Sequence, residues 1–326
     1  MKFLVTLLVL HNIVAVLGSQ KMPVVGILTQ EIPPEAKMSG SYFPASYVNF
    51  VESGGARVVP VWIGQNESYY RNLMKFINGV LFPGGSSSLD YKSNPKGYAA
   101  AGNLIYNIAK EIEHKEQQPF PLWGTCLGME LLVVAANNGT NFLVKCSANN
   151  ISLPLKFEKK RVNTNLYKTI EPDLLKKLKN DSITANFHHN CVLEKDIRKP
   201  NIWKTLTTSK DKSGVVFVSS IEALNNNFFG VQFHPEKNTY VWGPSFEQLD
   251  RSLAAIKFQQ YLSNTFIEFA RKNNHTFPNY ETLQKLLIEN YNPIINNNIT
   301  GNQQQINFPL NIPTMLLRLL MYTKLI

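Results

Sequence analysis

Leu122-Trp123-Gly124-Thr125-Cys126-Leu127-Gly128 is the most informative stretch of this sequence. It has the form Gly-x-Cys-x-Gly and is followed by a run with helical character, residues 129–136. Glycines two residues on either side of a cysteine let the chain turn sharply from a strand into a helix. This pattern indicates the cysteine form of a nucleophile elbow, with the thiol exposed above a sheet.

Such a turn places the Cys126 thiol at the N-terminus of a helix. The N-terminus of a helix favours a thiolate, so we expect the pKa of Cys126 to be lowered. The backbone N–H of Leu127 would point at an oxyanion, and the turn Gly84-Gly85 could supply a second donor. The alternative is that Cys126 is only a small buried apolar residue between glycines that pack a helix.

Strands and helices alternate around this stretch. Apolar, β-branched runs predict buried strands, and polar-apolar periodicity predicts the helices between them. The expected strands are 23–28, 56–61 and 79–82, and the expected helices are 42–52 and 69–78. This order predicts an α/β fold, a three-layer sandwich with a mainly parallel central sheet.

Sites in such sheets lie beyond the carboxyl ends of the strands. Pro83-Gly84-Gly85, Gly124-Thr125-Cys126 and His234-Pro235-Glu236 all follow expected strands. We therefore expect these three segments to meet at one edge of the sheet.

His234 and Glu236 are the expected partners of Cys126. A thiol nucleophile needs a base and then an acid, and one histidine can act as both. The two side chains are two residues apart, so on an extended backbone both point the same way and the carboxylate can orient the imidazole.

The adjacent pair His188-His189 is open to two interpretations. It is either a loop pair without chemistry or the source of a substrate-contacting imidazole.

The rest of the chain divides into three parts. Residues 143–218 suggest mixed short strands with a helix over 171–179, and 245–273 suggests one long helix that starts in a capping box at Ser245. The Asn- and Gln-rich segment 296–307 suggests a flexible linker. The apolar tail 315–322 is too short to span a bilayer, and its role stays open.

The N-terminus has the pattern of a cleaved signal peptide over residues 1–19. Lys2 precedes a short apolar run that ends at the small residues Gly18 and Ser19, and His11-Asn12 makes the run too polar for a stable membrane span. Six Asn-x-Ser/Thr sequons agree with the secretory route. They begin at Asn66, Asn138, Asn150, Asn180, Asn274 and Asn298.

Composition sets further bounds. The chain has 326 residues, 44% hydrophobic and 17% charged, as in an ordinary globular protein. Its net charge of +10 is spread out, which argues against nucleic-acid binding and is only weak support for an anionic substrate.

Among its three cysteines, Cys146 and Cys191 either pair or are both buried thiols, and at least one thiol stays free. No metal-ligand spacing occurs, so we expect neither a metal nor another cofactor.

Several of these segments, in this order, resemble the class I glutamine amidotransferase-like superfamily and, within it, the γ-glutamyl hydrolases. The resemblance covers about residues 22–280, expected as the catalytic domain, and leaves 281–326 as linker and tail. The segments that carry it are Pro23–Gln30, Ala45–Val48, Glu52–Val61, Phe82–Gly85, Trp123–Glu130, Asn186–His188, Phe233–Lys237 and Ala270–His275.

The resemblance implies a hydrolase that removes γ-linked glutamates from folate (pteroyl) polyglutamates. Together with the signal-peptide pattern, we expect it in the lysosome or outside the cell. It implies that Cys126 is the nucleophile, His234 the proton donor and Glu236 the carboxylate of the triad. It also implies that His188 is a second functional histidine, and that the substrate site is lined by Tyr47 and Glu130. The chain departs from the family after His188, where His189-Asn190-Cys191 replaces a Lys-Trp continuation.

Three alternatives remain beside this interpretation. A glutamine amidotransferase uses the same elbow, but it serves a synthetase in the cytosol, which does not fit a signal peptide. A non-catalytic binding protein would not need Cys126, His234 and Glu236 together. A related peptidase could cleave a different amide, because loops set substrate choice. A homodimer is compatible with the sequence, which does not fix the oligomeric state.

Overall fold

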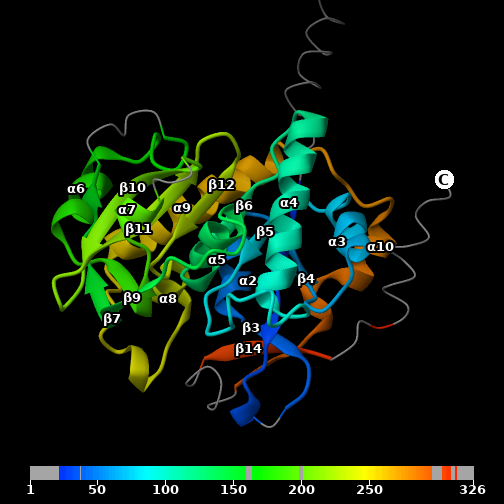
Figure 1. Cartoon of the computed structure of the whole chain (residues 1–326), viewed down its shortest axis with the longest axis horizontal. Coiled ribbons are helices and arrows are strands. Elements are labelled where there is room, and N and C mark those ends of the chain that lie inside the picture. The colour runs from blue at the N-terminus through cyan, green and yellow to red at the C-terminus, as the bar shows by residue number, and fades with distance from the viewer. Residues whose placement is uncertain are drawn as a thin grey trace, which may run out of the picture.

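An eight-stranded sheet forms the centre of the protein, in the order β4-β1-β5-β6-β12-β11-β10-β8 (Figure 1). We describe it in a computed structural model that covers residues 22–36, 38–158, 164–197, 201–295, 303–309 and 313. The first five strands are parallel, and β11, β10 and β8 continue the sheet antiparallel. Their bounds are β1 Val24–Leu28, β4 Arg57–Val61, β5 Gly79–Phe82, β6 Leu122–Thr125, β8 Lys156–Phe157, β10 Trp203–Lys210, β11 Val216–Ala223 and β12 Phe228–Val231.

Helices cover both faces of this sheet, which gives the predicted three layers (Figure 1). On one face α3, α4 and α5 pack side by side, and on the other α2, α6 and α8 pack against α9. The parallel strands are buried, as strands covered on both faces must be. The helices are α2 Ser46–Ser53, α3 Glu67–Met74, α4 Tyr98–Glu116, α5 Leu127–Ala136, α6 Pro172–Asn180, α7 Glu194–Ile197, α8 Pro235–Tyr240, α9 Leu253–Arg271 and α10 Tyr280–Leu286.

Two smaller sheets and three 3₁₀ turns complete the described part. A four-stranded sheet has the order β13-β14-β3-β2, and a two-stranded sheet pairs β7 with β9. These strands are β2 Gln30–Glu31, β3 Ser41–Pro44, β7 Val144–Leu153, β9 Thr184–Cys191, β13 Pro293–Ile295 and β14 Gln304–Phe308, and the turns are η1 Pro34–Ala36, η3 Pro244–Phe246 and η4 Ile288–Asn290. Within the described ranges, no helix combines the length and the apolar character that a membrane crossing needs.

Three helix boundaries differ from the predictions. Tyr42 belongs to strand β3, and the helix expected over 42–52 starts only at Ser46. Asn66 caps α3 by accepting from the N–H of Tyr69, so that helix starts before residue 69 and ends before residue 78. The long helix expected from Ser245 begins at Leu253, because Ser252 supplies the cap instead.

The C-terminal region is more ordered than its composition suggests. Residues 304–307, expected in a flexible linker, belong to β14, which pairs with β3 from the other end of the sequence. The ring of Phe308 packs against Phe43 and Trp62, with ring centroids 4.9 Å and 5.6 Å apart, respectively. Composition could not show this, because the pairing partner is more than 250 residues away. The predicted signal peptide, the remainder of the linker at 296–302 and the apolar tail 315–322 lie outside the described residues.

Replacing Phe308 with Ala tests whether this strand is part of the fold. The ring is buried, so its loss should lower the free energy of unfolding by about 3 kcal/mol. Urea unfolding measures the change. Ile295→Ala is the control, because Ile295 is 64% exposed and should change stability by less than about 0.5 kcal/mol. Equal effects of the two substitutions would show that β14 is only loosely attached.

Candidate active site

The turn from β6 into α5 places Cys126 at the carboxyl edge of the sheet. Its backbone has φ +53° and ψ −111°, an unusual conformation for a residue with a side chain, and its N–H donates to the carbonyl of Val231 at 2.8 Å. Gly124 and Gly128 permit the turn: a Cβ on Gly124 would lie 2.5 Å from the Gly128 backbone, and one on Gly128 would overlap the Phe82 carbonyl. The sharp strand-to-helix turn is therefore present.

The three expected segments meet at Gly84. A Cβ placed on Gly84 would lie 2.7 Å from His234 Cε1, 2.7 Å from Tyr47 Oη and 3.1 Å from Cys126 Cβ. The thiol and the imidazole therefore lie on the same side of the sheet, close to one another.

His234 is held from one side of its ring. Its Nδ1 lies 2.8 Å from Glu236 Oε1 and 3.3 Å from Tyr47 Oη. Because a carboxylate only accepts hydrogen bonds, Nδ1 carries the proton and Nε2 remains available. Tyr47 Oη also accepts from the N–H of Gly84 at 2.8 Å, which ties this imidazole to the Gly84 turn.

Burial governs the electrostatics of the pair. Burial raises the pKa of the Cys126 thiol, and the charge of Glu130 raises it further, whereas the N–H of Leu127 acts in the opposite direction. The predicted lowering of this pKa is therefore wrong for the free protein, and the predicted exposure is too, since Cys126 is 4% exposed. Desolvation exceeds the effect of the helix N-terminus.

The pKa values of His234 and Glu236 also depend on burial and on the attraction between the two side chains. Burial lowers the pKa of His234 despite the neighbouring Glu236. Burial alone would raise the pKa of Glu236, but the charge and hydrogen bond of His234 lower it overall. The resting site consequently holds a neutral thiol, a neutral imidazole and a carboxylate.

Glu130 and Gln232 lie behind the thiol. Gln232 Nε2 donates to Glu130 Oε1 at 3.0 Å and lies 3.8 Å from Cys126 Sγ. Burial raises the pKa of Glu130 to about 8, so this side chain is mostly protonated at neutral pH. Gln232 is not among the site residues predicted from the sequence, although it is the lone polar residue in the apolar run 228–233 and could have been noticed there.

The expected oxyanion donors differ in their surroundings. The N–H of Leu127 bonds to the Cys126 sulfur, the atom whose attack would create the oxyanion. The N–H of Gly84 is already donated to Tyr47. Gly85 is packed directly against the side-chain amide of Gln30, which itself donates to the carbonyl of Gly84 at 3.3 Å.

His188 lies in β9 beside a disulfide. Its Nε2 contacts Asn186 Oδ1 at 3.1 Å, and its Nδ1 contacts the Asn190 carbonyl at 3.0 Å. Burial lowers the pKa of His188 to about 4, and the charge of His234 contributes in the same direction. His188 is thus a buried, neutral ring in the neighbourhood of His234, while His189 is exposed.

Cys146 and Cys191 form the disulfide, which leaves Cys126 as the free cysteine. With His188 they bring three potential metal ligands within 4.8 Å of one another, a grouping that sequence spacing did not reveal. Because the two sulfurs are bonded to each other, they are not available as thiolates.

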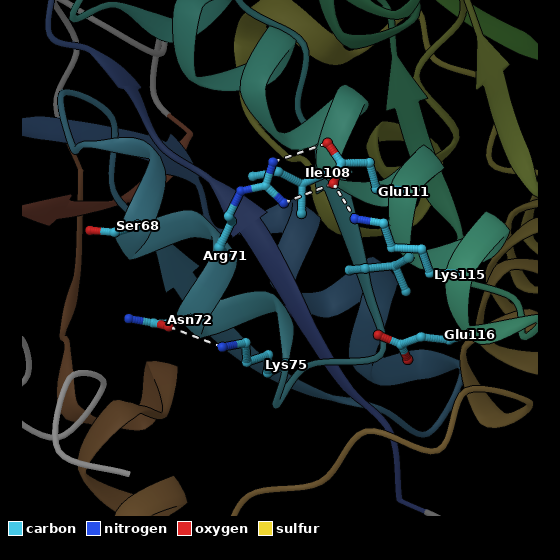
Figure 2. Close-up of a pocket in the computed structure, with 9 residues that line it drawn as sticks. Ser68, Arg71, Asn72, Lys75, Ile108, Glu111, Lys115 and Glu116 are labelled. Carbon is cyan, nitrogen blue, oxygen red and sulfur yellow. Dashed lines mark hydrogen bonds and ion pairs between the residues drawn. The ribbon is translucent and has the colours of Figure 1, made fainter. Parts of the chain in front are cut away.

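A cavity between α3 and α4 lies away from this cluster (Figure 2). Its volume is about 360 Å³, and it is lined by Arg71, Glu111 and Lys115 among others. Arg71 pairs with Glu111 at 3.0 Å, and Lys115 pairs with the same carboxylate at 3.2 Å. These charges satisfy one another, and Lys115 stands at the opposite end of α4 from the Gly84 turn, so this cavity is not a candidate active site.

Comparison with known proteins identifies the chain as a cysteine-type peptidase. The sequence profile of the Peptidase C26 family matches residues 23–236. "Gamma-glutamyl hydrolase B" of Dictyostelium discoideum is 38% identical over 277 residues, 83% of this chain and 78% of that one. The human and bovine proteins named "Gamma-glutamyl hydrolase" are 35% and 36% identical, over 87% and 88% of this chain and 89% and 90% of theirs. The chain belongs to the Peptidase C26 family.

The raised pKa of Glu130 predicts a pH-dependent stability. The folded protein holds this proton up to about pH 8, whereas the unfolded chain loses it near 4.5, so stability should fall as pH rises between these values. One proton contributes a slope of up to about 1.4 kcal/mol per pH unit. Glu130→Gln should remove this part of the slope, as measured by urea unfolding from pH 4.5 to 8. An unchanged slope would contradict a protonated Glu130.

The disulfide should make a separate contribution to stability. Its cysteines are 45 residues apart, and opening a loop of that size lowers stability by about 4 kcal/mol in the chain-entropy description. The double variant Cys146→Ala/Cys191→Ala should unfold at a correspondingly lower urea concentration. A reducing agent should destabilise the wild type and leave the variant unchanged. If the reductant destabilises both proteins equally, the effect does not come from this bond.

Proposed function

We propose that this protein hydrolyses γ-glutamyl amide bonds of folate poly-γ-glutamates through a thioester on Cys126. The observation that carries the proposal is the meeting of Cys126, His234 and Tyr47 around Gly84, with Glu236 on the imidazole. The names of the relatives support the choice of a γ-glutamyl bond.

The resting protonation states define the first step. Since burial keeps the thiol protonated, its proton must pass to His234 Nε2 as the sulfur attacks the γ-carbonyl carbon. Glu236 then forms an ion pair with the imidazolium of His234, and this pair stabilises the positive charge that the proton transfer created. The oxyanion forms against the N–H groups of Leu127 and Gly85.

The second half reverses the proton transfer. The imidazolium gives its proton to the departing glutamate nitrogen, and the C–N bond breaks to leave a thioester. Water then attacks the thioester with His234 as base, which releases the shortened product and restores the thiol. Tyr47 positions the imidazole through its contact with Nδ1, and Glu130 and His188 line the substrate site in this proposal.

We further propose that the protein enters the secretory pathway and works in the lysosome or outside the cell. The Cys146–Cys191 disulfide supports an oxidising route, because disulfides persist there and are rare in the cytosol. The sequons and the pattern of residues 1–19 agree with this. Homodimerisation stays a prediction that light scattering can decide.

Cys126→Ala tests the proposed function directly. The substitution removes the nucleophile but little buried volume, so the rate should fall by roughly 10⁴-fold while the unfolding transition is retained. The assay incubates purified protein with a γ-linked pteroyl triglutamate and identifies the products by mass.

Free glutamine serves as the second substrate in that assay. Ammonia release from glutamine without cleavage of the γ-linked chain would indicate a glutaminase instead. Hydrolysis that survives in Cys126→Ala would exclude a thioester on this residue.

A further inference from the structure

The imidazole of His188 lies against both sulfur atoms of the Cys146–Cys191 disulfide. Its Nδ1 is 3.5 Å from Cys146 Sγ and 3.4 Å from Cys191 Sγ. A register shift in β7 between Lys145 and Ala148 leaves Cys146 in a bulge of the β7–β9 ladder, and a bulge of this kind redirects a side chain. One residue of β7 and two of β9 are thereby brought to a single point.

The distances from Nδ1 to the two sulfurs are those of ligand pairs on one zinc ion. Tetrahedral zinc has bonds of about 2.3 Å to sulfur and about 2.0 Å to nitrogen, which place a thiolate and an imidazole nitrogen about 3.5 Å apart. Two thiolates on the same ion lie about 3.8 Å apart. Once the S–S bond is broken, only the separation between the two sulfurs has to increase for zinc to fit.

The hydrogen bonds of His188 also favour a cation at Nδ1. Asn186 Nδ2 donates to the carbonyl of Thr184 at 2.8 Å, so Asn186 Oδ1 faces His188 Nε2. Nδ1 lies 3.0 Å from a second acceptor, the carbonyl of Asn190. Burial keeps the ring neutral by lowering its pKa to about 4, and a neutral imidazole has one N–H for these two oxygens. A metal ion on Nδ1 would leave the proton on Nε2 for Asn186, the outer-shell contact that orients a histidine ligand.

The surroundings of the three side chains are apolar. Cys191 and Phe217 are fully buried, and the Phe217 ring stands edge-on to His188 with the ring centroids 5.0 Å apart. Two thiolates balance the charge of Zn²⁺, so the complex would bring no net charge into this setting. Cys146 is half-buried, which makes its sulfur the accessible end of the disulfide for a reductant.

We propose that reduction of this disulfide creates a zinc site formed by Cys146, Cys191 and His188, with water as the fourth ligand. A dithiol reductant is oxidised to its own disulfide, the S–S bond of the protein breaks, and the two cysteines take up the two protons. Zn²⁺ then displaces these protons and forms two bonds to sulfur and one to nitrogen. β7 and β9 are thus cross-linked in both states, by the disulfide when oxidised and by the metal when reduced. The site does not depend on the proposed hydrolase activity.

Zinc binding by the oxidised and the reduced full chain tests the site. All proteins in this experiment carry Cys126→Ala, because the Cys126 thiol beside His234 would offer zinc a second site. A phosphine is the reductant, since a dithiol would compete for the metal. After desalting, elemental analysis should find one Zn²⁺ per chain in the reduced protein and none in the oxidised protein. Co²⁺ in place of zinc should give the thiolate-to-metal absorption of a tetrahedral site only after reduction.

Two further variants identify the ligands. His188→Gln and Cys146→Ser/Cys191→Ser should each weaken zinc binding to the reduced protein by at least roughly 100-fold in competition with a chromophoric chelator, because loss of a direct ligand exceeds the 10- to 100-fold effect of an outer-shell change. His189→Gln is the matched control, since His189 is adjacent but exposed, and it should bind like the parent. Zinc should also raise the urea midpoint of the reduced parent and leave that of reduced His188→Gln unchanged.

Three outcomes would overturn the site. Absence of zinc from the reduced parent would exclude it without reference to any variant. Equal zinc content in the oxidised protein would place the metal elsewhere, and unchanged affinity in His188→Gln would show that the imidazole is not a ligand. Each of these results leaves the proposed function standing, because the pteroyl triglutamate assay measures Cys126-dependent hydrolysis separately.

Discussion

The backbone turn at Cys126 is the constraint on which the rest of the site depends. A cysteine at φ +53° is held there by close packing of Gly124, Gly128 and the Phe82 carbonyl, with its N–H fixed to Val231 on the neighbouring strand. Strain of this kind persists only where the surroundings determine it fully. The parallel sheet provides such surroundings, because β5, β6 and β12 end at one edge and bring Gly84, Cys126 and His234 together.

Desolvation is the second physical effect that determines the properties of the site. The site is almost closed to solvent, so burial keeps the thiol and the imidazole neutral in the free protein even though a carboxylate touches the ring. In the proposed mechanism, charge separation depends on groups that are already in place: Glu236 for the imidazolium and the N–H of Leu127 for the oxyanion. The helix N-terminus lowers the pKa of the thiol, but this effect is smaller than the effect of burial.

Segments from distant parts of the sequence complete the site. β14 pairs with β3, the residue before β14 contacts Lys237, and Lys237 lies between rings from β9 and η3. The disulfide links β7 to β9 next to His188. The site therefore lies at the edge of the central sheet, and strands of the two smaller sheets border it.

The α/β class and the elbow at Cys126 could be predicted from the sequence, because glycine spacing and buried apolar strands are local properties. The contact of His234 with Glu236 was also predicted, but the reason given for it was wrong, since Glu236 lies in the first turn of α8 and not on extended backbone. The cysteine pairing, the strand at residues 304–308, the position of Gln232 beside the thiol and the protonation states became clear from the three-dimensional structure alone. Each of these depends on partners far away in the chain or on burial. A local pattern contains neither the distance between two remote segments nor the amount of water left around a thiol.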